Sequence, residues 1–322
     1  MKTGTTLRTR SGDVPTELGL GGCPLGGHGW GSTAAIDFEG TVRAALDGGI
    51  TLFDTADCYG FGASETLLGR CLPRDRDGIF VASKFGVRWD ESGRTTRDTS
   101  PEYARHAVEA SLRRLATDVI DLVFVHWPDG RTPLEQTTGE LAKLRDEGKI
   151  RYIGLSNVDL REVTHRSVLD ATRAWQIPFS LLHLPPAGAL EAAARSDIPI
   201  VAWGALAQGL LTGKYDRTSS FGSDDRRRRY SDFVGDQLAR NLRVVDEVRA
   251  TARRSRRETS QVALRWTLDH PSVSHCLFGA KRPEQVATNR EVSGWRLPKN
   301  DHALLHAAAE GLGNQWFPET VQ

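Results

Sequence analysis

Four polar residues stand where the chemistry of a βα protein is usually found. Asp54, Tyr59, Lys84 and His126 each come at, or soon after, the end of a short apolar run. Near-continuous apolar runs of this length are typical of parallel strands that are buried on both faces. In a closed barrel of alternating strands and helices, the active site lies at the carboxyl ends of the strands. An acid, a phenol, an amine and an imidazole at that end need no metal and suit proton transfer to a substrate oxygen. The chain is therefore predicted to be an enzyme.

Strands and helices, which must position these residues, are predicted to alternate along almost the whole chain. Eight short apolar segments are typical of strands: residues 17–20, 50–54, 79–83, 120–125, 152–155, 174–175, 198–203 and 273–278. Helical patterns lie between most of them, and the clearest begins at Ser100-Pro101, where a serine N-cap precedes proline at the first helical position. Eight strands with intervening helices predict a (β/α)8 barrel. We find no internal repeat or low-complexity linker, so one domain over residues 1–322 is the simplest division.

Composition is that of a soluble globular protein. The 322 residues are 39% hydrophobic and 26% charged, with a formal net charge of +1. This charge gives no electrostatic reason to expect binding to nucleic acid or to an anionic membrane surface, and no apolar run approaches the ~20 residues that span a bilayer. The four cysteines form no CxxC pair, and the polar N-terminus does not resemble a secretion signal. We expect a reduced, cytoplasmic protein without a structural metal, and the sequence leaves its homo-oligomeric state open.

Six motifs in order resemble those of the aldo-keto reductase superfamily over nearly the whole chain. They are Asp54-Thr55-Ala56 with Tyr59-Gly60, Ser83-Lys84-Phe85, Val125-His126-Trp127, Gly154-Leu155-Ser156-Asn157, the segment 206–215, and Gly279-Ala280-Lys281. The branch that is most similar includes bacterial reductases and potassium-channel β-subunits. The resemblance implies a (β/α)8 TIM barrel with an N-terminal β-hairpin and with extra helices after the seventh strand and at the C-terminus.

The same resemblance implies that a ketone or aldehyde is reduced to an alcohol. Tyr59 would donate the proton to the carbonyl oxygen, and His126 would hydrogen-bond that carbonyl and orient it. A free phenol has a pKa near ~10 and donates poorly at neutral pH. The ammonium group of Lys84 is expected to lower the pKa of Tyr59, while Asp54 would keep Lys84 charged and in place.

The cofactor implied by the resemblance is NADPH or NADP+, lying across the barrel mouth. A glycine-rich dinucleotide fingerprint is excluded, because Pro24 stands where its third glycine would be. The implied cofactor contacts are Ser156, Asn157, Gln176, Trp203, Leu206, Gln208, Gly209, Leu211, Lys214, Gly279, Lys281, Arg282, Gln285 and Asn289. Lys281 and Arg282 favour a 2′-phosphate, and so NADPH over NADH, although two solvated surface cations are the alternative. For the run Arg226 to Arg229, solvated side chains are expected, with a contact to cofactor phosphate or to a neighbouring subunit as the alternative.

The substrate is encoded less clearly. Trp30, Trp89 and Trp127 follow the first, third and fourth predicted strands. With Phe61, His28 and Trp316 they predict a wide aromatic pocket. Packing roles for the tryptophans are the alternative. The pocket favours a bulky or aromatic carbonyl, such as a polyketide side chain in antibiotic or other natural-product biosynthesis. Reduction of a nucleotide-linked deoxysugar is the rival enzyme function, and an NADPH-sensing regulatory subunit is the rival from another class.

Overall fold

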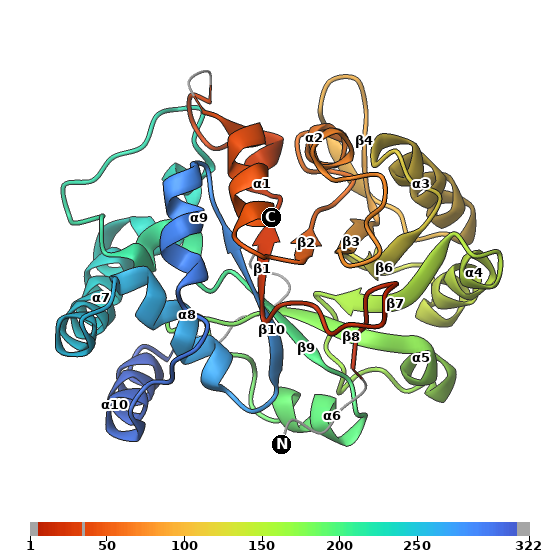
Figure 1. Cartoon of the computed structure of the whole chain (residues 1–322). Helices are drawn as coiled ribbons and strands as arrows, with labels where there is room; N and C mark the ends of the chain where they lie inside the picture. The colour runs from red at the N-terminus through yellow and green to blue at the C-terminus, as the bar shows by residue number, and fades with distance from the viewer. Residues whose placement is uncertain (1–5, 34–35, 314–322) are drawn as a thin grey trace.

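The computed structural model describes residues 6–33 and 36–313 and confirms the predicted barrel. Eight parallel strands close in the order β1-β10-β9-β8-β7-β6-β3-β2, and helices surround them as a ring (Figure 1). The barrel strands are β1 (Leu18–Gly21), β2 (Leu52–Asp54), β3 (Phe80–Phe85), β6 (Ile120–Val125), β7 (Ile150–Ser156), β8 (Thr172–Pro178), β9 (Ile200–Trp203) and β10 (Val273–Gly279). Every predicted strand segment overlaps one of them.

The helices follow the strands in the expected rhythm. Those that alternate with the barrel strands are α1 (Phe38–Asp47), α2 (Ala63–Cys71), α3 (Pro101–Arg114), α4 (Leu134–Asp146), α5 (Arg166–Ala171), α6 (Ala189–Arg195), α8 (Thr259–Asp269) and α9 (Pro283–Arg290). The two extra helices are also present: α7 (Gly235–Ser255) comes after β9, and α10 (Lys299–Glu310) lies at the C-terminal end of the described chain. Among the helices of residues 6–33 and 36–313, none is long and apolar enough to cross a membrane.

The expected N-terminal β-hairpin is wrong for residues 6–17, which form a turn and no strand. The guanidinium group of Arg151 donates to the carbonyl oxygens of Arg8 and Thr9 at 2.8 and 3.1 Å, so a side chain binds acceptors that a second strand would have paired. The antiparallel hairpin of this chain lies elsewhere, between β4 (Val87–Trp89) and β5 (Thr95–Arg97) after β3.

The barrel interior is filled by side chains that point inward at every second strand position. Its apolar core consists of Leu7, Leu52, Phe80, Ala82, Leu122, Phe124, Ala174, Val201 and Leu277. The same alternation continues from Leu52 to Asp54 on β2 and from Phe80 and Ala82 to Lys84 on β3. The strand period therefore turns both charged side chains into the barrel, at the carboxyl end of the strands.

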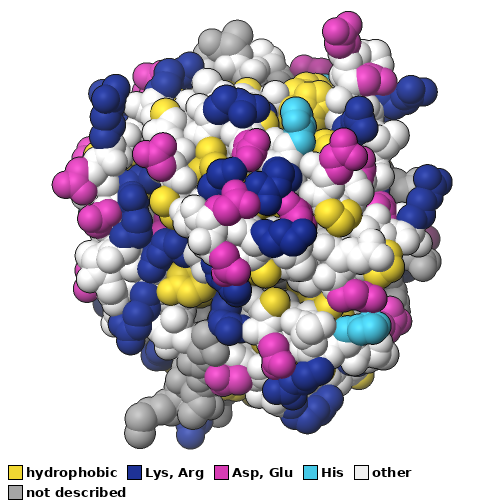
Figure 2. Space-filling view, turned by 90° about the vertical axis from the view of Figure 1, so that its right-hand side faces the viewer, with side chains coloured by type: hydrophobic (Ala, Val, Ile, Leu, Met, Phe, Trp, Pro, Cys, Tyr) yellow, Lys and Arg dark blue, Asp and Glu magenta, His cyan; other side chains and the backbone are white. Residues whose placement is uncertain are grey.

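The outer surface over α3 and α4 carries charges of both signs. Arg105 contacts Glu140 and Glu147 at 2.7 Å each, and Lys149 contacts Glu109 at 2.7 Å. Figure 2 shows acidic and basic side chains interspersed over this side of the molecule. Such exposed pairs contribute about 0–1 kcal/mol each, so the stability of the fold depends mainly on the barrel core.

Leu7 offers a direct test of how the N-terminal segment contributes. Its side chain is 1% exposed and packs into the barrel core. Leu7→Ala should lower the free energy of unfolding by about 2–5 kcal/mol, because it removes buried methyl groups and leaves a cavity. Urea unfolding would measure this, with Val14→Ala as the control, since Val14 is 54% exposed and should change stability by less than about 0.5 kcal/mol. Equal stabilities of the two variants would contradict the contribution of Leu7 to the barrel core.

Candidate active site

A buried ion pair lies at the centre of the site. The ammonium group of Lys84 donates to Asp54 Oδ1 at 2.5 Å and to the carbonyl oxygen of Thr55 at 2.8 Å. Gln176 Nε2 donates to the other carboxylate oxygen of Asp54 at 2.7 Å. Burial raises the pKa of Asp54, while Lys84 and Gln176 oppose that rise. The pair and Gln176 connect β2, β3 and β8 at one end of the barrel, and the Asp54 carboxylate balances the positive charge of Lys84.

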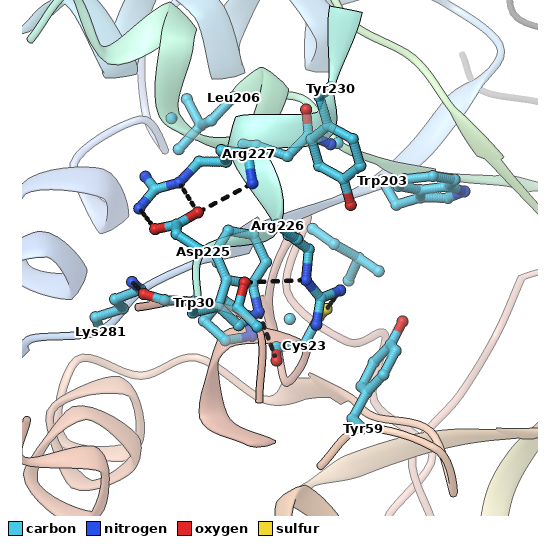
Figure 3. Close-up of a pocket in the computed structure, with 18 of the residues that line it drawn as sticks. Cys23, Trp30, Tyr59, Trp203, Leu206, Asp225, Arg226, Arg227, Tyr230 and Lys281 are labelled. Atoms are coloured by element: carbon cyan, nitrogen blue, oxygen red, sulfur yellow. Dashed lines mark hydrogen bonds and ion pairs between the residues drawn. The ribbon is translucent and has the colours of Figure 1, made fainter. Parts of the chain in front are cut away.

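Tyr59 lies beside this pair, on the loop between β2 and α2. Its ring centroid is 5.0 Å from Lys84 Nζ and 5.8 Å from the His126 ring, which it meets edge to face. Figure 3 shows the Tyr59 hydroxyl pointing into the pocket. Two glycines hold the loop: a Cβ at Gly26 would lie 2.6 Å from the backbone nitrogen of Gly60, so only hydrogen fits there.

The expected lowering of the Tyr59 pKa by Lys84 is wrong for this structure. Burial raises the pKa of the Tyr59 phenol well above its ordinary value, and the nearby Cys23 and Asp54 add to that rise. Arg226 acts in the opposite direction. The charge of Lys84 is shared with Asp54 at 2.5 Å, so its effect on the phenol is small beside desolvation. Tyr59 is therefore a protonated phenol at neutral pH, which is the form that a proton donor needs.

His126 is held as a neutral imidazole. Its pKa lies well below the ordinary value because of burial and because of the positive charges of Lys84 and Arg97. Its backbone is fixed on both sides, since its N–H donates to the carbonyl of Phe85 at 2.8 Å and its carbonyl accepts from Asn157 Nδ2 at 2.9 Å. A neutral ring in this position can donate one N–H to a carbonyl oxygen.

These groups open into a cleft of about 2540 Å³ at the mouth of the barrel. Pockets for a single small molecule measure roughly 300–1,000 Å³, so this cleft has room for a larger ligand together with a small one. Asp54, Tyr59 and His126 line it, whereas Lys84 lies buried behind them. Of the implied cofactor contacts only Leu211 does not line the cleft, because its side chain is fully buried in the core.

The nicotinamide end of the predicted cofactor site contains a buried acceptor. Asn157 has φ +56°, and its Oδ1 is buried without a hydrogen-bond partner in the described part of the chain. This atom fits the amide N–H of a carboxamide. The Gln176 side chain also donates to Asp54 and accepts from Ser156 Oγ at 3.4 Å, and its contact with a cofactor stays a prediction. Gln176 therefore supports the ion pair from the wall of the cleft.

Residues 222–231, here called the mouth strap, reach from the β9 side of the barrel to the loop after β1. Arg226 N donates to the Gly29 carbonyl at 2.9 Å, and its guanidinium donates to the His28 carbonyl at 2.6 Å. Trp30 pairs with Asp225 in an isolated antiparallel bridge, and Lys281 Nζ donates to the Trp30 carbonyl at 2.6 Å. Figure 3 shows Trp30, Asp225, Arg226 and Lys281 meeting above the pocket.

The arginine run is not uniformly solvated, so that expectation is wrong for its first half. Arg227 is buried, donates from Nε to Asp225 at 2.9 Å and stacks 4.5 Å from the Phe221 ring centroid. Arg226 is partly buried, with its guanidinium 5.0 Å from the Trp30 ring centroid. Arg228 and Arg229 are exposed, as predicted.

Lys281 lies among these cations. Burial and the neighbouring Arg227 lower the pKa of Lys281 to about 8. An anion bound beside such a lysine stabilises its ammonium form and raises its pKa again.

Trp316 lies outside the residues that the structure describes, and the other three predicted pocket tryptophans have different surroundings. Trp30 lines the cleft beneath the mouth strap, and Trp127 lines it with Arg97 stacked at 4.8 Å. Trp89 does not line the cleft and that prediction is wrong: it borders a separate cavity of about 570 Å³ beside α3. Its ring packs 6.1 Å from that of Phe61 and has Arg114 at 5.9 Å, which draws it to the α3 side of the β4–β5 hairpin.

Sequence reasoning missed several residues that line the cleft. Arg97 and the adjacent Thr95 and Thr96 come from β5, a strand that was not predicted, and Tyr230 comes from the mouth strap. Tyr230 lies beside Arg226 and Trp203 in Figure 3. The two adjacent β-branched threonines were the available signal for β5, but three polar residues are too few to predict a strand.

Comparison with known proteins agrees with the fold. The model of the Aldo/keto reductase family matches residues 17–310. Aldo-keto reductase YhdN of Bacillus subtilis is 34% identical over 304 residues, covering 93% of this chain and 92% of that protein. The NADH-specific methylglyoxal reductase of Escherichia coli is 31% identical, covering 92% and 95%. The solved glycerol dehydrogenase of Gluconobacter oxydans has a TM-score of 0.83 and 34% identity, covering 94% of each chain.

The family match shows that this closed barrel, with an ion pair, a phenol and an imidazole at its mouth, is that of an oxidoreductase acting on carbonyl and alcohol groups. The chain belongs to the aldo-keto reductase family, whose members use nicotinamide cofactors.

The buried pair makes a stability prediction. Lys84→Met leaves the Asp54 carboxylate without its cation and should lower the free energy of unfolding by about 3–5 kcal/mol at pH 7. Asp54 would then take up a proton in the folded state, so its folded pKa would lie above the unfolded one. A group with a raised folded pKa contributes stability at low pH that is lost as the pH rises. The loss of unfolding free energy caused by Lys84→Met should therefore be smaller at pH 5 than at pH 8.

Urea unfolding of Lys84→Met at both pH values measures this effect. The double variant Asp54→Asn with Lys84→Met is the control, because it has no carboxylate to titrate and its difference from the native chain should change less with pH. A Lys84→Met variant whose defect is the same at both pH values would show that Asp54 is not the titrating group.

Proposed function

We propose that this enzyme reduces a ketone or aldehyde to an alcohol with NADPH, and that Tyr59 donates the proton. The observation that carries the proposal is a protonated phenol and a neutral imidazole side by side on the wall of one cleft. Carbonyl reduction needs a proton donor at the oxygen and a second donor to hold that oxygen in place.

Each residue of the tetrad has a separate task in this proposal. Tyr59 gives its proton to the carbonyl oxygen, and a neutral His126 donates a hydrogen bond to the same oxygen. Lys84 stabilises the phenolate that forms, since its ammonium group lies 5.0 Å from the ring. Asp54 keeps that ammonium group charged within the barrel. General acid catalysis of this kind contributes about 10²–10⁴-fold in rate.

The bound nicotinamide supplies the hydride. Asn157 Oδ1 is the acceptor available for its carboxamide, and Trp203 offers a ring face at the same end of the cleft. Lys214, Lys281 and Arg282 would hold phosphate at the other end. The cationic surroundings of Lys281 support NADPH, and a Schizosaccharomyces pombe relative at 33% identity carries NADP(+) in its name. The Escherichia coli relative is NADH-specific, so the choice needs a direct measurement.

The substrate end of the cleft supports a carbonyl with a bulky or aromatic substituent. Phe61 is 36% exposed there, with the His28 ring 4.9 Å away, and Trp127 faces the same space. An apolar ring left exposed in a cleft gains most from a ligand that covers it. A polyketide or similar natural-product carbonyl, or a nucleotide-linked deoxysugar, would meet this requirement.

A small polar carbonyl is the second candidate. Arg97, Thr95 and Thr96 add polar donors to the same wall, and two relatives are named for methylglyoxal and glycerol. Steady-state kinetics with aromatic ketones, aromatic aldehydes, methylglyoxal and dihydroxyacetone would separate the candidates by kcat/KM. Tight NADPH binding without turnover of any carbonyl would favour a regulatory subunit instead.

Tyr59→Phe tests the proton donor. The change removes one oxygen and keeps the ring, so NADPH affinity, measured by quenching of tryptophan fluorescence, should stay within roughly twofold. The rate of carbonyl reduction should fall by about 10²–10⁴-fold. Turnover close to that of the native enzyme would remove Tyr59 from its proposed role.

Lys281 predicts how cofactor binding depends on pH. With a pKa of about 8, its free amine loses charge between pH 7 and pH 9. A bound phosphate favours the charged form, so binding takes up a proton and the affinity for NADPH should fall as the pH rises, by up to about tenfold per unit above pH 8. Lys281→Arg should remove this dependence, because arginine stays charged.

Lys281→Met is the matched test of the phosphate. Isothermal titration should show weaker NADPH binding with little change for NADH. A native enzyme that binds NADH as tightly as NADPH at pH 7 would contradict the 2′-phosphate contact.

A further inference from the structure

A second group of titratable side chains lies directly beside Tyr59. Asp57, Cys58 and His126 each offer a ligand-type atom, and these three atoms all lie within 4.8 Å of one another. Cys58 Sγ and His126 Nδ1 are 3.7 Å apart. A carboxylate, a thiol and an imidazole are together the donor types that zinc takes in proteins.

Asp57 gives independent support, because it is a buried acid without a partner. It is 1% exposed, and neither carboxylate oxygen accepts a hydrogen bond from the described residues. The nearest cations are engaged elsewhere: Arg114 contacts Glu65 at 2.6 Å, and Lys84 contacts Asp54 at 2.5 Å. A buried carboxylate in this state costs free energy unless it is protonated or meets a cation.

The spacing is close to what one metal ion requires. Zinc binds sulfur at about 2.3 Å and nitrogen or oxygen at about 2.0–2.2 Å, so tetrahedral ligand atoms lie about 3.5 Å apart. The Cys58–His126 pair already meets this distance. The other separations are at most 4.8 Å, so the side chains need to approach by about 1 Å or somewhat more, which small χ rotations provide.

We propose that Asp57, Cys58 and His126 bind a zinc ion, or another thiophilic divalent cation, with the fourth position open to water, and that the bound ion stops carbonyl reduction. On binding, the Cys58 thiol and the protonated Asp57 carboxyl each release a proton to solvent, and the resulting thiolate and carboxylate offset the two positive charges of the ion. Hard cations such as magnesium prefer oxygen ligands and should not compete.

The inhibitory part of the proposal rests on the proposed function, because the ion would draw the imidazole that orients the substrate carbonyl toward Asp57 and Cys58. The binding part does not rest on it. A spectroscopic measurement with cobalt can therefore test the site even if no carbonyl substrate is turned over.

The full chain, purified under reducing conditions and freed of metal, would be titrated with Co²⁺ and its absorption recorded. We expect one cobalt per chain, a thiolate-to-cobalt charge-transfer band in the near ultraviolet, and loss of the band when Zn²⁺ is added. Cys58→Val should abolish the band, and Asp57→Asn, which keeps the side-chain shape, should weaken cobalt binding at least tenfold. Cys71→Val is the matched control on α2, and it should behave as the native chain does.

Zinc inhibition is the second readout, with each variant compared with its own zinc-free rate. Micromolar Zn²⁺ should inhibit the native chain and Cys71→Val, and should inhibit Cys58→Val at least tenfold less effectively. No thiolate band in the native chain, or a band that survives in Cys58→Val, would overturn the site. Cobalt binding as described without zinc inhibition of a working reductase would overturn the inhibitory part.

Discussion

The buried ion pair between Lys84 and Asp54 is the interaction on which the rest of the active site depends. Two charges inside a barrel are unfavourable unless each has several partners, and here the carbonyl of Thr55 and the amide of Gln176 complete the set. Burial sets the charge state of the groups beside the pair. Because Asp54 offsets the ammonium group, burial dominates at Tyr59, which remains a protonated phenol beside a neutral His126.

The cleft above this pair brings together two kinds of surface. Its inner end is rigid, since the side chains on it come from strand ends and from a loop that Gly26 and Gly60 hold in close contact. Its outer end is built by the mouth strap, which reaches the loop after β1 through backbone contacts and Arg226. In the proposed function, the chemistry is therefore placed on the barrel, while the contacts with cofactor phosphate and substrate are made by loops, as is common for this fold.

The barrel and the tetrad could be predicted because both depend on local patterns. Alternation along β2 and β3 places Asp54 and Lys84 on the inward face, and every predicted strand formed. The errors concern contacts between distant segments. Arg226 reaches a carbonyl 198 residues away, which no local pattern records, and Trp89 is drawn aside by packing on Phe61. The predicted direction of the shift in the Tyr59 pKa was also wrong. The sequence indicates which charges lie near the phenol, but it does not show how deeply the phenol is buried.

The central claim is that Asp54 offsets the charge of Lys84, so that Lys84 does not lower the pKa of Tyr59. Tyr59 is then a protonated acid in the free enzyme. Carbon-13 NMR of protein labelled at the tyrosine Cζ measures this most directly, with the Tyr59→Phe spectrum assigning the resonance. We predict that the Tyr59 signal keeps the chemical shift of a neutral phenol to above pH 10. A midpoint well below the ordinary phenol value, near neutral pH, would contradict the account and would show that Lys84 acts on the phenol as a free charge.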